Sequence, residues 1–287
     1  MARSAPLYDG DQAILATMHG KERIIAPLAC RFVGLSLEAS AGLDTDRFGT
    51  FSREVARAGS QLDAARAKIA AAFDLYPDIG VALASEGSFG PHPYLPFCAL
   101  NREIVVLRDR RNEWELIGHN ATSSTNFAHT IVRDSATGLA FAERAGFPTH
   151  GMIVMGIREG EAAPDLMLFK EIDDQDELIR AIDATLEQCG SAFLETDMRA
   201  HRNPRRMRAI GRAMVDLVRK TRSACPECAR PGFAVSKRLA GLPCAWCGDA
   251  TLLIRADVWA CAGCGLLLER PVEATHADPG HCPGCNP

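Results

Sequence analysis

The sequence has few of the features that would place it in a specialised class of protein. Only 6% of its 287 residues are aromatic, and no internal repeat or low-complexity tract is present. No apolar run reaches the roughly 18 residues that a membrane span needs. The hydrophobic share of 47% and the charged share of 24% are ordinary for a folded protein, which excludes disorder, collagen and coiled coil. At roughly 150 residues per domain, the length predicts about two domains.

Cysteine is scarce in the first 222 residues and abundant after them. The long first part holds only Cys30, Cys98 and Cys189, whereas the last 65 residues hold eight of the 11 cysteines. Asp9 and Asp11 stand where a signal peptide would have its apolar core, so we expect an unexported, cytoplasmic protein. In a reducing compartment, paired cysteines indicate metal ligands rather than disulfides.

The eight clustered cysteines form four Cys-x-x-Cys pairs. Two such pairs complete the shell of one tetrahedral ion, so the sequence predicts two structural four-cysteine sites. We expect zinc, with an iron–sulfur cluster or rubredoxin-like iron as the alternative. Cys-Gly in the second and third pairs, with Trp259 between them, favours a zinc ribbon made by those two pairs. The first and fourth pairs would then share the other ion, and sequential pairing is the alternative. The pairs are Cys225/Cys228, Cys244/Cys247, Cys261/Cys264 and Cys282/Cys285.

The cysteine-poor part alternates strand and helix patterns. This alternation predicts an α/β domain with a mixed sheet flanked by helices. We place this domain, which would bind a nucleotide or another anion, at residues 1–222, and a small zinc-ribbon-like domain at 223–287. Helix caps are expected at Ser60 and at Asn203. The expected strands are 12–17, 79–84, 103–107, 113–118, 150–156, 166–172 and 192–195, and the expected helices include 125–145, 174–189 and 204–218.

Charge is distributed as unevenly as cysteine. Residues 1–198 carry 18 Lys/Arg against 29 Asp/Glu, whereas residues 199–222 carry nine against Asp216 alone. Such a basic block indicates an anionic partner or an acidic face of the same chain, and a solvated helix face is the alternative.

Two loops at the ends of predicted strands could carry chemistry. Thr17, His19 and Lys21 follow the first strand and precede a helix, where backbone N–H groups and a lysine can hold a phosphate. The segment 85–90 is expected as a glycine turn after a buried strand, where Glu86 could bind a metal or activate water. The alternatives are a solvated lysine and a glutamate that caps a neighbouring element.

The sequence resembles two families. Ala-Thr-Met-His-Gly-Lys-Glu, Ser-Glu-Gly-Ser-Phe-Gly-Pro-His-Pro and Cys-Pro-Glu-Cys-Ala-Arg-Pro-Gly-Phe are similar to an uncharacterised bacterial domain family, over nearly the whole chain. Residues 12–220 distantly resemble the inosine triphosphate pyrophosphatase and Maf-like nucleotide pyrophosphatases. The similar motifs are Thr17 to Lys21, Asp63 to Lys68, Ala84 to Ser88 and Ala200 to Arg202. His19 stands where that family has Asn, and only one of its two acids is present.

The second resemblance implies a metal-dependent nucleotide pyrophosphatase or related phosphohydrolase, with magnesium as a possible cofactor. Glu86 and Asp63 would hold the metal and position water, and His201 would contact the base or a phosphate. The substrate-binding residues would be Thr17, His19, Lys21, Lys68, Ser88, Arg199 and Arg202. The alternative is a non-enzymatic zinc protein that binds a nucleotide or nucleic acid, or serves as a protein adaptor. We expect no membrane partner, and a homodimer is possible.

Overall fold

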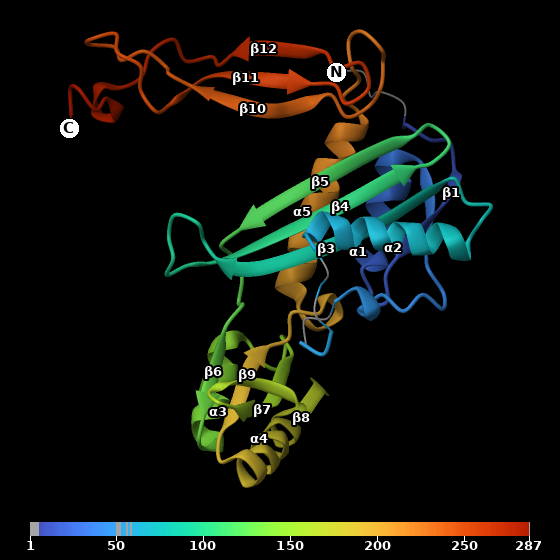
Figure 1. Ribbon diagram of the computed structural model, residues 1–287, viewed down its shortest axis with the longest axis vertical. Coiled ribbons are helices and arrows are strands. Elements are labelled where there is room, and N and C mark those ends of the chain that lie inside the picture. Colours follow the sequence, from blue (N-terminus) through green and yellow to red (C-terminus); the bar gives the residue numbers. More distant parts are fainter. Residues whose placement is uncertain (1–5, 50–52, 56, 58, 287) are drawn as a thin grey trace. The chain divides into compact units, whose positions relative to one another are not determined.

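The computed structural model describes residues 6–49, 53–55, 57 and 59–286. The chain divides into two compact units, Pro6–Val218 and a C-terminal unit that begins at Arg219. The first unit contains two sheets with helices, and the second contains a three-stranded sheet (Figure 1). This confirms the expected mixed α/β fold followed by a small cysteine-rich module. In the described part of the chain, no helix is long and apolar enough to cross a membrane.

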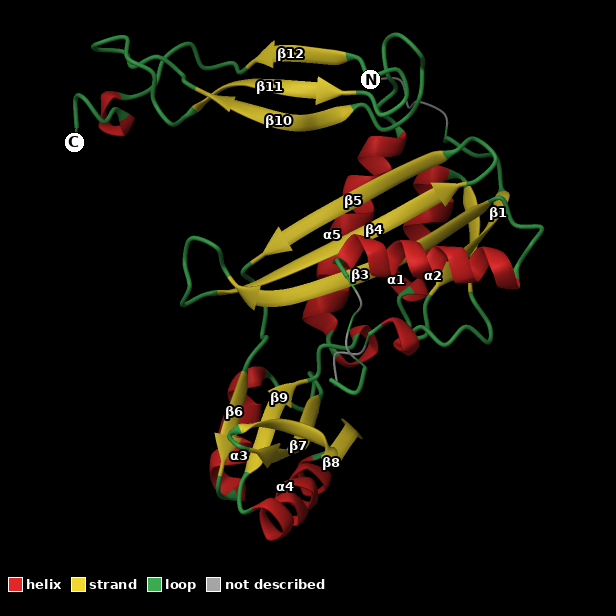
Figure 2. Ribbon diagram, viewed as in Figure 1, coloured by secondary structure: helices red, strands yellow, loops and turns green. Residues whose placement is uncertain are grey.

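The first sheet is mixed and has the strand order β2-β1-β3-β4-β5. β1 pairs in parallel with β2 and β3, whereas β3, β4 and β5 form antiparallel pairs (Figure 2). The strands are β1 Asp11–Ala16, β2 Leu35–Ala39, β3 Val81–Pro91, β4 Ala99–Asp109 and β5 Trp114–Thr122.

Helices cover both faces of this sheet because successive strand residues point to opposite sides. On one face, Leu15 and Leu83 pack with Ile25 and Met214 from α1 (Glu22–Leu28) and α5 (Pro204–Thr221). On the other face, the neighbouring strand residues Ile14 and Ala84 pack with α2 (Gln61–Leu75). A π-helical turn, Ala29–Val33, extends α1, and a 3-10 turn, Asp46–Phe48, follows β2.

The second sheet is an insertion between β5 and α5. Its order is β6-β9-β7-β8, its pairings are antiparallel, and α3 and α4 pack against one face. Asp134 and Asp174 cap the N-termini of these helices, and Gly146 and Gly190 end them in the left-handed conformation. The elements are β6 His129–Val132, α3 Ser135–Ala145, β7 Met152–Arg158, β8 Glu161–Ile172, α4 Gln175–Cys189 and β9 Ala192–Thr196.

Both expected helix caps are confirmed. Ser60 and Asp63 form the reciprocal capping box of α2. The side chain of Asn203 accepts the N–H of Arg206 at 3.0 Å, next to Pro204 in the first helical position.

Two expected elements differ from the structure. The segment 85–90 is not a turn, because β3 stays paired with β4 as far as Pro91, opposite Ala99. The helix expected at 125–145 begins only at Ser135, because residues 129–132 form β6 against β9. In both cases backbone pairing with another strand, β4 in the first case and β9 in the second, overrides the local pattern.

The C-terminal unit is built on an antiparallel sheet with the order β10-β11-β12. One Cys-x-x-Cys pair precedes the sheet, one follows each of the first two strands, and one follows the last. The strands are β10 Ala234–Ala240, β11 Ile254–Ala260 and β12 Leu267–Pro271, followed by a 3-10 turn at Pro279–His281.

Candidate functional site

The clustered cysteines form two groups of four. Within each group all the Sγ atoms lie within 4.8 Å of one another, and the shortest separations are 3.6 Å. A tetrahedral zinc–thiolate shell with bonds of about 2.3 Å requires Sγ separations of about 3.8 Å. Each group therefore has the ligand chemistry and spacing to hold one metal ion, consistent with a small zinc-binding module. The groups are Cys225, Cys228, Cys261, Cys264 and Cys244, Cys247, Cys282, Cys285.

The groups interleave along the chain, so both expected pairings are wrong. The first pair joins the third, and the second joins the fourth. In an antiparallel meander, successive connections lie at alternating ends of the sheet. The pairs before β10 and after β11 therefore share one end, and the pairs after β10 and after β12 share the other. Trp259 of β11 instead contacts Phe233, at 5.6 Å between ring centroids.

Backbone donors favour the ligand form of one thiol in each group, Cys261 and Cys244. The N–H of Gly263 donates to Cys261 Sγ at 3.3 Å, and that of Trp246 donates to Cys244 Sγ at 3.4 Å. Backbone hydrogen bonds, from Cys264 foremost, lower the pKa of Cys261 to about 6, and those from Cys247 and Trp246 lower that of Cys244 to about 7. Four thiolates fill a tetrahedral shell, so an ion there has no open position for substrate.

A second cluster of functional side chains lies in the first unit, around Lys21. This residue precedes α1, is only 5% exposed, and donates from Nζ to the carbonyl of Ser85 at 2.8 Å. The carboxylate of Glu86, next along β3, forms ion pairs with Lys68 of α2 and with Arg57, the latter at 3.3 Å. The structure therefore brings together Lys21, Lys68 and Glu86, all three of which the sequence had suggested.

A buried ion pair lies across the sheet from Glu86. Glu103 of β4 accepts from Arg206 Nε of α5 at 2.9 Å. Glu103 shares the α5 side of β4 with Val105, whereas Glu86 shares the α2 side of β3 with Ala84. The two carboxylates thus lie on opposite faces of the sheet and cannot chelate the same ion. We call Lys21, Arg57, Lys68, Glu86, Glu103 and Arg206 the Lys21 cluster.

The Lys21 cluster contains more positive than negative side chains, four against two. Burial, and then the charge of Arg206, lower the pKa of Lys21 to about 7. Burial alone would raise the pKa of Glu86, but the charges of Lys21 and Lys68 bring it below its usual range. A buried excess of cations is unfavourable without a counter-charge, so the cluster suits an anion.

Two histidines connect the loop after β1 to the loop before α5. His19 and His201 stack with their ring centroids 5.1 Å apart. His19 Nε2 lies 2.9 Å from Asp46 Oδ1, and His201 Nε2 lies 3.4 Å from a carboxylate oxygen of Glu171. The hydroxyl of Thr17 accepts the N–H of His19 at 3.4 Å. The structure therefore places three predicted substrate-binding or catalytic residues, Thr17, His19 and His201, side by side.

Two other predicted site residues, Asp63 and Ser88, form part of a helix cap and of a paired strand. The exposed carboxylate of Asp63 accepts the backbone N–H of Ser60 at 3.0 Å and its hydroxyl at 2.7 Å, as part of the capping box. Ser88 is half-buried in β3, opposite Arg102, rather than in a glycine turn.

The predicted arginines of the loop before α5 are held by acidic and backbone groups. Arg199 is buried and pairs with Asp197 at 2.5 Å and with Glu171. Arg202 donates to the carbonyl of Ile172 at 2.6 Å and also pairs with Asp173. These contacts anchor the loop to the end of β8.

The sequence did not single out three members of the Lys21 cluster, namely Arg57, Glu103 and Arg206. Glu103 begins the apolar run EIVVL, and Arg206 lies four residues before Ile210, on the apolar side of the helix pattern. A charged residue at an otherwise apolar position could therefore have indicated both. Arg57 carries no comparable local signal. Gln61 was also missed, although its Nε2 donates to the carbonyl of Glu86 at 2.5 Å.

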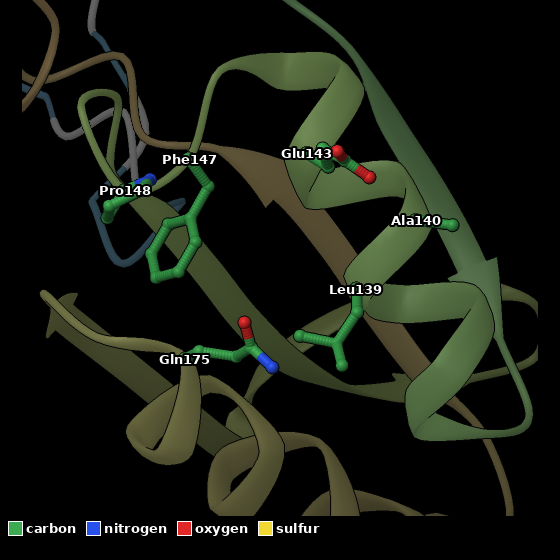
Figure 3. Close-up of a pocket in the computed structure, with 6 residues that line it drawn as sticks. All are labelled: Leu139, Ala140, Glu143, Phe147, Pro148 and Gln175. Carbon is green, nitrogen blue, oxygen red and sulfur yellow. The ribbon is translucent and has the colours of Figure 1, made fainter.

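A separate cavity of about 560 Å³ lies between α3 and the start of α4 (Figure 3). Its charged lining residue is Glu143, beside the apolar side chains of Leu139 and Phe147 and the amide of Gln175. Because none of the described residues that line it is a cation, this cavity does not fit the anion suggested by the Lys21 cluster.

Comparison with known proteins gives one family match. Residues 68–287 match the model of a family described as a domain of unknown function, DUF6671. The match begins at Lys68 in α2, so it includes Glu86, Arg206 and the eight clustered cysteines, whereas Lys21 precedes it. No curated protein matches the chain.

Proposed function

Because the chain belongs to the DUF6671 family, whose description assigns no activity, we propose a function from the Lys21 cluster: it binds the phosphate groups of a nucleotide-like anion. One observation carries this proposal, namely the excess of buried cationic side chains around Lys21. A phosphate would supply the missing negative charge and would hold Lys21 in its protonated form.

The cluster offers two kinds of phosphate donor. Lys21 and Lys68 present compact ammonium groups, and Arg57 presents a planar guanidinium that can donate two parallel hydrogen bonds to phosphate oxygens. Arg57 already donates to the carbonyl of Gly87 at 2.7 Å, which fixes its guanidinium beside Glu86. An anion would therefore compete with Glu86 for all three cations.

The stacked histidines support recognition of the rest of the anion. The side chains of His19 and His201 are partly exposed. His19 lies in the loop just before Lys21, and His201 lies in the loop just before the helix that carries Arg206. We assign them, with Thr17 and Ser88, to contacts beyond the phosphates. Arg199 and Arg202 hold the second loop in position through Glu171 and Asp173.

A second candidate function is metal-dependent hydrolysis of the bound anion, in the manner of a nucleotide pyrophosphatase. Its support is Glu86, a buried carboxylate whose lowered pKa keeps it ionised at neutral pH. Glu86 would hold a magnesium ion, which would supply positive charge to neutralise the charge that develops on the phosphates. Asp63 is bound in the capping box and Glu103 lies on the opposite face, so Glu86 is the carboxylate on which the proposal depends.

Binding is tested by calorimetry with inorganic triphosphate and ATP. We expect Lys21→Met and Lys68→Met to weaken binding by at least about tenfold, because each removes a charge-assisted hydrogen bond. Lys237→Met, at an exposed position on β10, serves as the matched control and should bind like the wild type. Equal affinity in all four proteins would contradict the proposal.

Hydrolysis is tested separately, by release of phosphate and pyrophosphate from ordinary and deaminated nucleoside triphosphates with magnesium. Glu86→Gln should lose release while it retains binding of triphosphate. Release that is unchanged in Glu86→Gln would eliminate the hydrolase candidate and leave the binding function standing.

For the C-terminal unit, we propose that both ions are zinc and that they stabilise the fold. A three-stranded sheet of this size has too small a core to fold without such crosslinks. A reducing cytoplasmic setting would keep the eight thiols available as ligands. Metal analysis of the purified protein should therefore find about two zinc ions per chain.

A further inference from the structure

The outer face of α5 carries a row of arginines. Arg205, Arg208 and Arg212 are spaced three and four residues apart, so their side chains lie on one side of the helix. The opposite side packs into the core through Ile210 and Met214. Arg208 and Arg212 are exposed, and Arg205 is half-buried. We call these three residues the arginine row.

The side chains of the arginine row are not neutralised by ion pairs in the described part of the chain. Within residues 6–49, 53–55, 57 and 59–286, none of these three side chains forms a hydrogen bond or an ion pair, and neither does the side chain of Arg144 near the end of α3. Arg206, on the same helix, is by contrast paired with Glu103. The charges of this row also act on a neighbouring histidine. Burial is the main cause of the lowered pKa of His150, and the charges of Arg205 and Arg208 lower it further.

A cavity of about 280 Å³ adjoins the first member of the row. It lies between the β5–β6 connection, the end of α3 and the start of α5. Arg144 and Arg205 both line it, together with Phe127 and Phe141. Phe127 is half-buried and stacks on Phe89 at 5.5 Å, which holds its ring in place. The cavity thus combines unpaired cations with fixed aromatic surfaces.

We propose that this surface binds single-stranded nucleic acid, with phosphates along the arginine row and one nucleotide in the aromatic cavity. Successive members of the row are about 4.5 and 6 Å apart along the helix axis, from Arg205 to Arg208 and from Arg208 to Arg212. These separations are on the same scale as the spacing of phosphates along one nucleic-acid strand. Binding of single strands typically combines a basic track with aromatic side chains on which bases stack. A base in a duplex cannot enter such a cavity, which favours a single strand. The proposal uses no residue of the Lys21 cluster and does not depend on the function proposed there.

The test measures fluorescence anisotropy of a labelled single strand of about 12 nucleotides, within the length range such sites cover. The variant Arg205→Gln/Arg208→Gln/Arg212→Gln should bind at least about tenfold more weakly than wild type at low salt. Its plot of log affinity against log salt should be shallower by about 2, the change expected for three lost phosphate contacts. Circular dichroism and zinc content should match those of the wild type.

A matched control removes three exposed arginines from elsewhere in the first unit, in Arg31→Gln/Arg133→Gln/Arg180→Gln. It has the same net charge as the row variant and should bind within about twofold of wild type, because the effect is local. If the control weakens binding as much as the row variant does, or if the row variant binds like wild type, the arginine row is not the binding surface.

The cavity is tested with Phe127→Leu and with Arg144→Gln. Phe127→Leu should weaken binding by about fivefold or more without changing the salt slope, because stacking involves no counterion. Arg144→Gln, which changes no packed ring, should weaken binding and make the slope shallower. Unchanged affinity in both variants, or duplex binding as tight as single-strand binding, would overturn the assignment to a single strand. Lys21→Met should bind the strand like wild type, which separates this surface from the Lys21 cluster.

Discussion

Glu103 and Arg206 form a buried ion pair between residues 103 positions apart in the sequence. Their side chains are 0% and 1% exposed. Opposite Glu103, a Cβ atom on Gly87 would lie 2.6 Å from Glu103 Oε1 and from Arg206 Nη2. The absence of a side chain at Gly87 therefore leaves room for the pair, which joins β4 to α5 within the Lys21 cluster.

Breaking this pair should destabilise the first unit strongly. Arg206→Met leaves Glu103 buried without its closest cation, and we expect a loss of about 3–5 kcal/mol in the free energy of unfolding. Replacing both partners, in Glu103→Leu/Arg206→Met, should restore most of that loss because no lone charge remains. Urea unfolding of the wild type, the single variant and the double variant gives the three free energies of unfolding. A double variant less stable than Arg206→Met would show that the pair is not the cause.

Lys21 should make the stability of the ligand-free protein depend on pH. Its pKa is lowered from 10.5 to about 7, so between these values the unfolded chain binds one more proton than the folded protein. Stability should therefore rise as pH increases from about 7 to about 10.5. Lys21→Met should lack this rise and should be at least as stable as wild type at pH 7, since it removes a buried charge. Thermal unfolding across this pH range provides the measurement, with Lys237→Met as the control that keeps the wild-type slope.

Gly118 should tolerate no side chain. A Cβ atom there would lie 2.2 Å from the carbonyl oxygen of Ala213 and 2.6 Å from the backbone nitrogen of Leu217. Because these are backbone atoms of α5, the helix would have to move away from β5. We expect Gly118→Ala to lose about 3 kcal/mol or more of unfolding free energy. Gly90→Ala in β3, where a Cβ meets nothing within 4 Å, is the matched control and should change stability little.

The interleaved metal sites give a counting test with cysteine double variants. Cys228→Ser/Cys261→Ser removes two ligands from one site, so about one zinc ion should remain. Cys228→Ser/Cys247→Ser removes one ligand from each site and should weaken or empty both. Mass spectrometry under native conditions counts the ions. Sequential pairing would give the opposite pattern, since Cys228 and Cys247 would then share a site.

The sequence predicted features that depend on local chemistry. The capping box at Ser60, the N-cap at Asn203 and the cysteine ligands follow from nearby residues alone. It did not predict the full length of β3, because Glu86 and Gly87 carry no apolar signal and their place depends on pairing with β4. The cysteine pairing failed for a similar reason, since it follows from strand order.

The same distinction applies to the Lys21 cluster. Lys21, Lys68 and Glu86 lie at recognisable strand and helix positions, and the structure brings them together. The members that the sequence missed come from β4, from α5 and from the segment before α2. Their contact with the others depends on how distant elements pack, which no local pattern contains.

The place of α5 in the chain has a consequence for synthesis. This helix completes one apolar face of the first sheet, yet the whole second sheet is translated between β5 and α5. At typical rates of about 5–20 residues per second, the ribosome needs about 5–20 seconds for the residues between the end of β5 and the end of α5. During that interval α1, the π-helical turn and the residues around Tyr8 cover this face beside Leu15 and Leu83 without α5. The insertion therefore sets a minimum delay before the nascent first unit can close, and chaperones have that time to act on it.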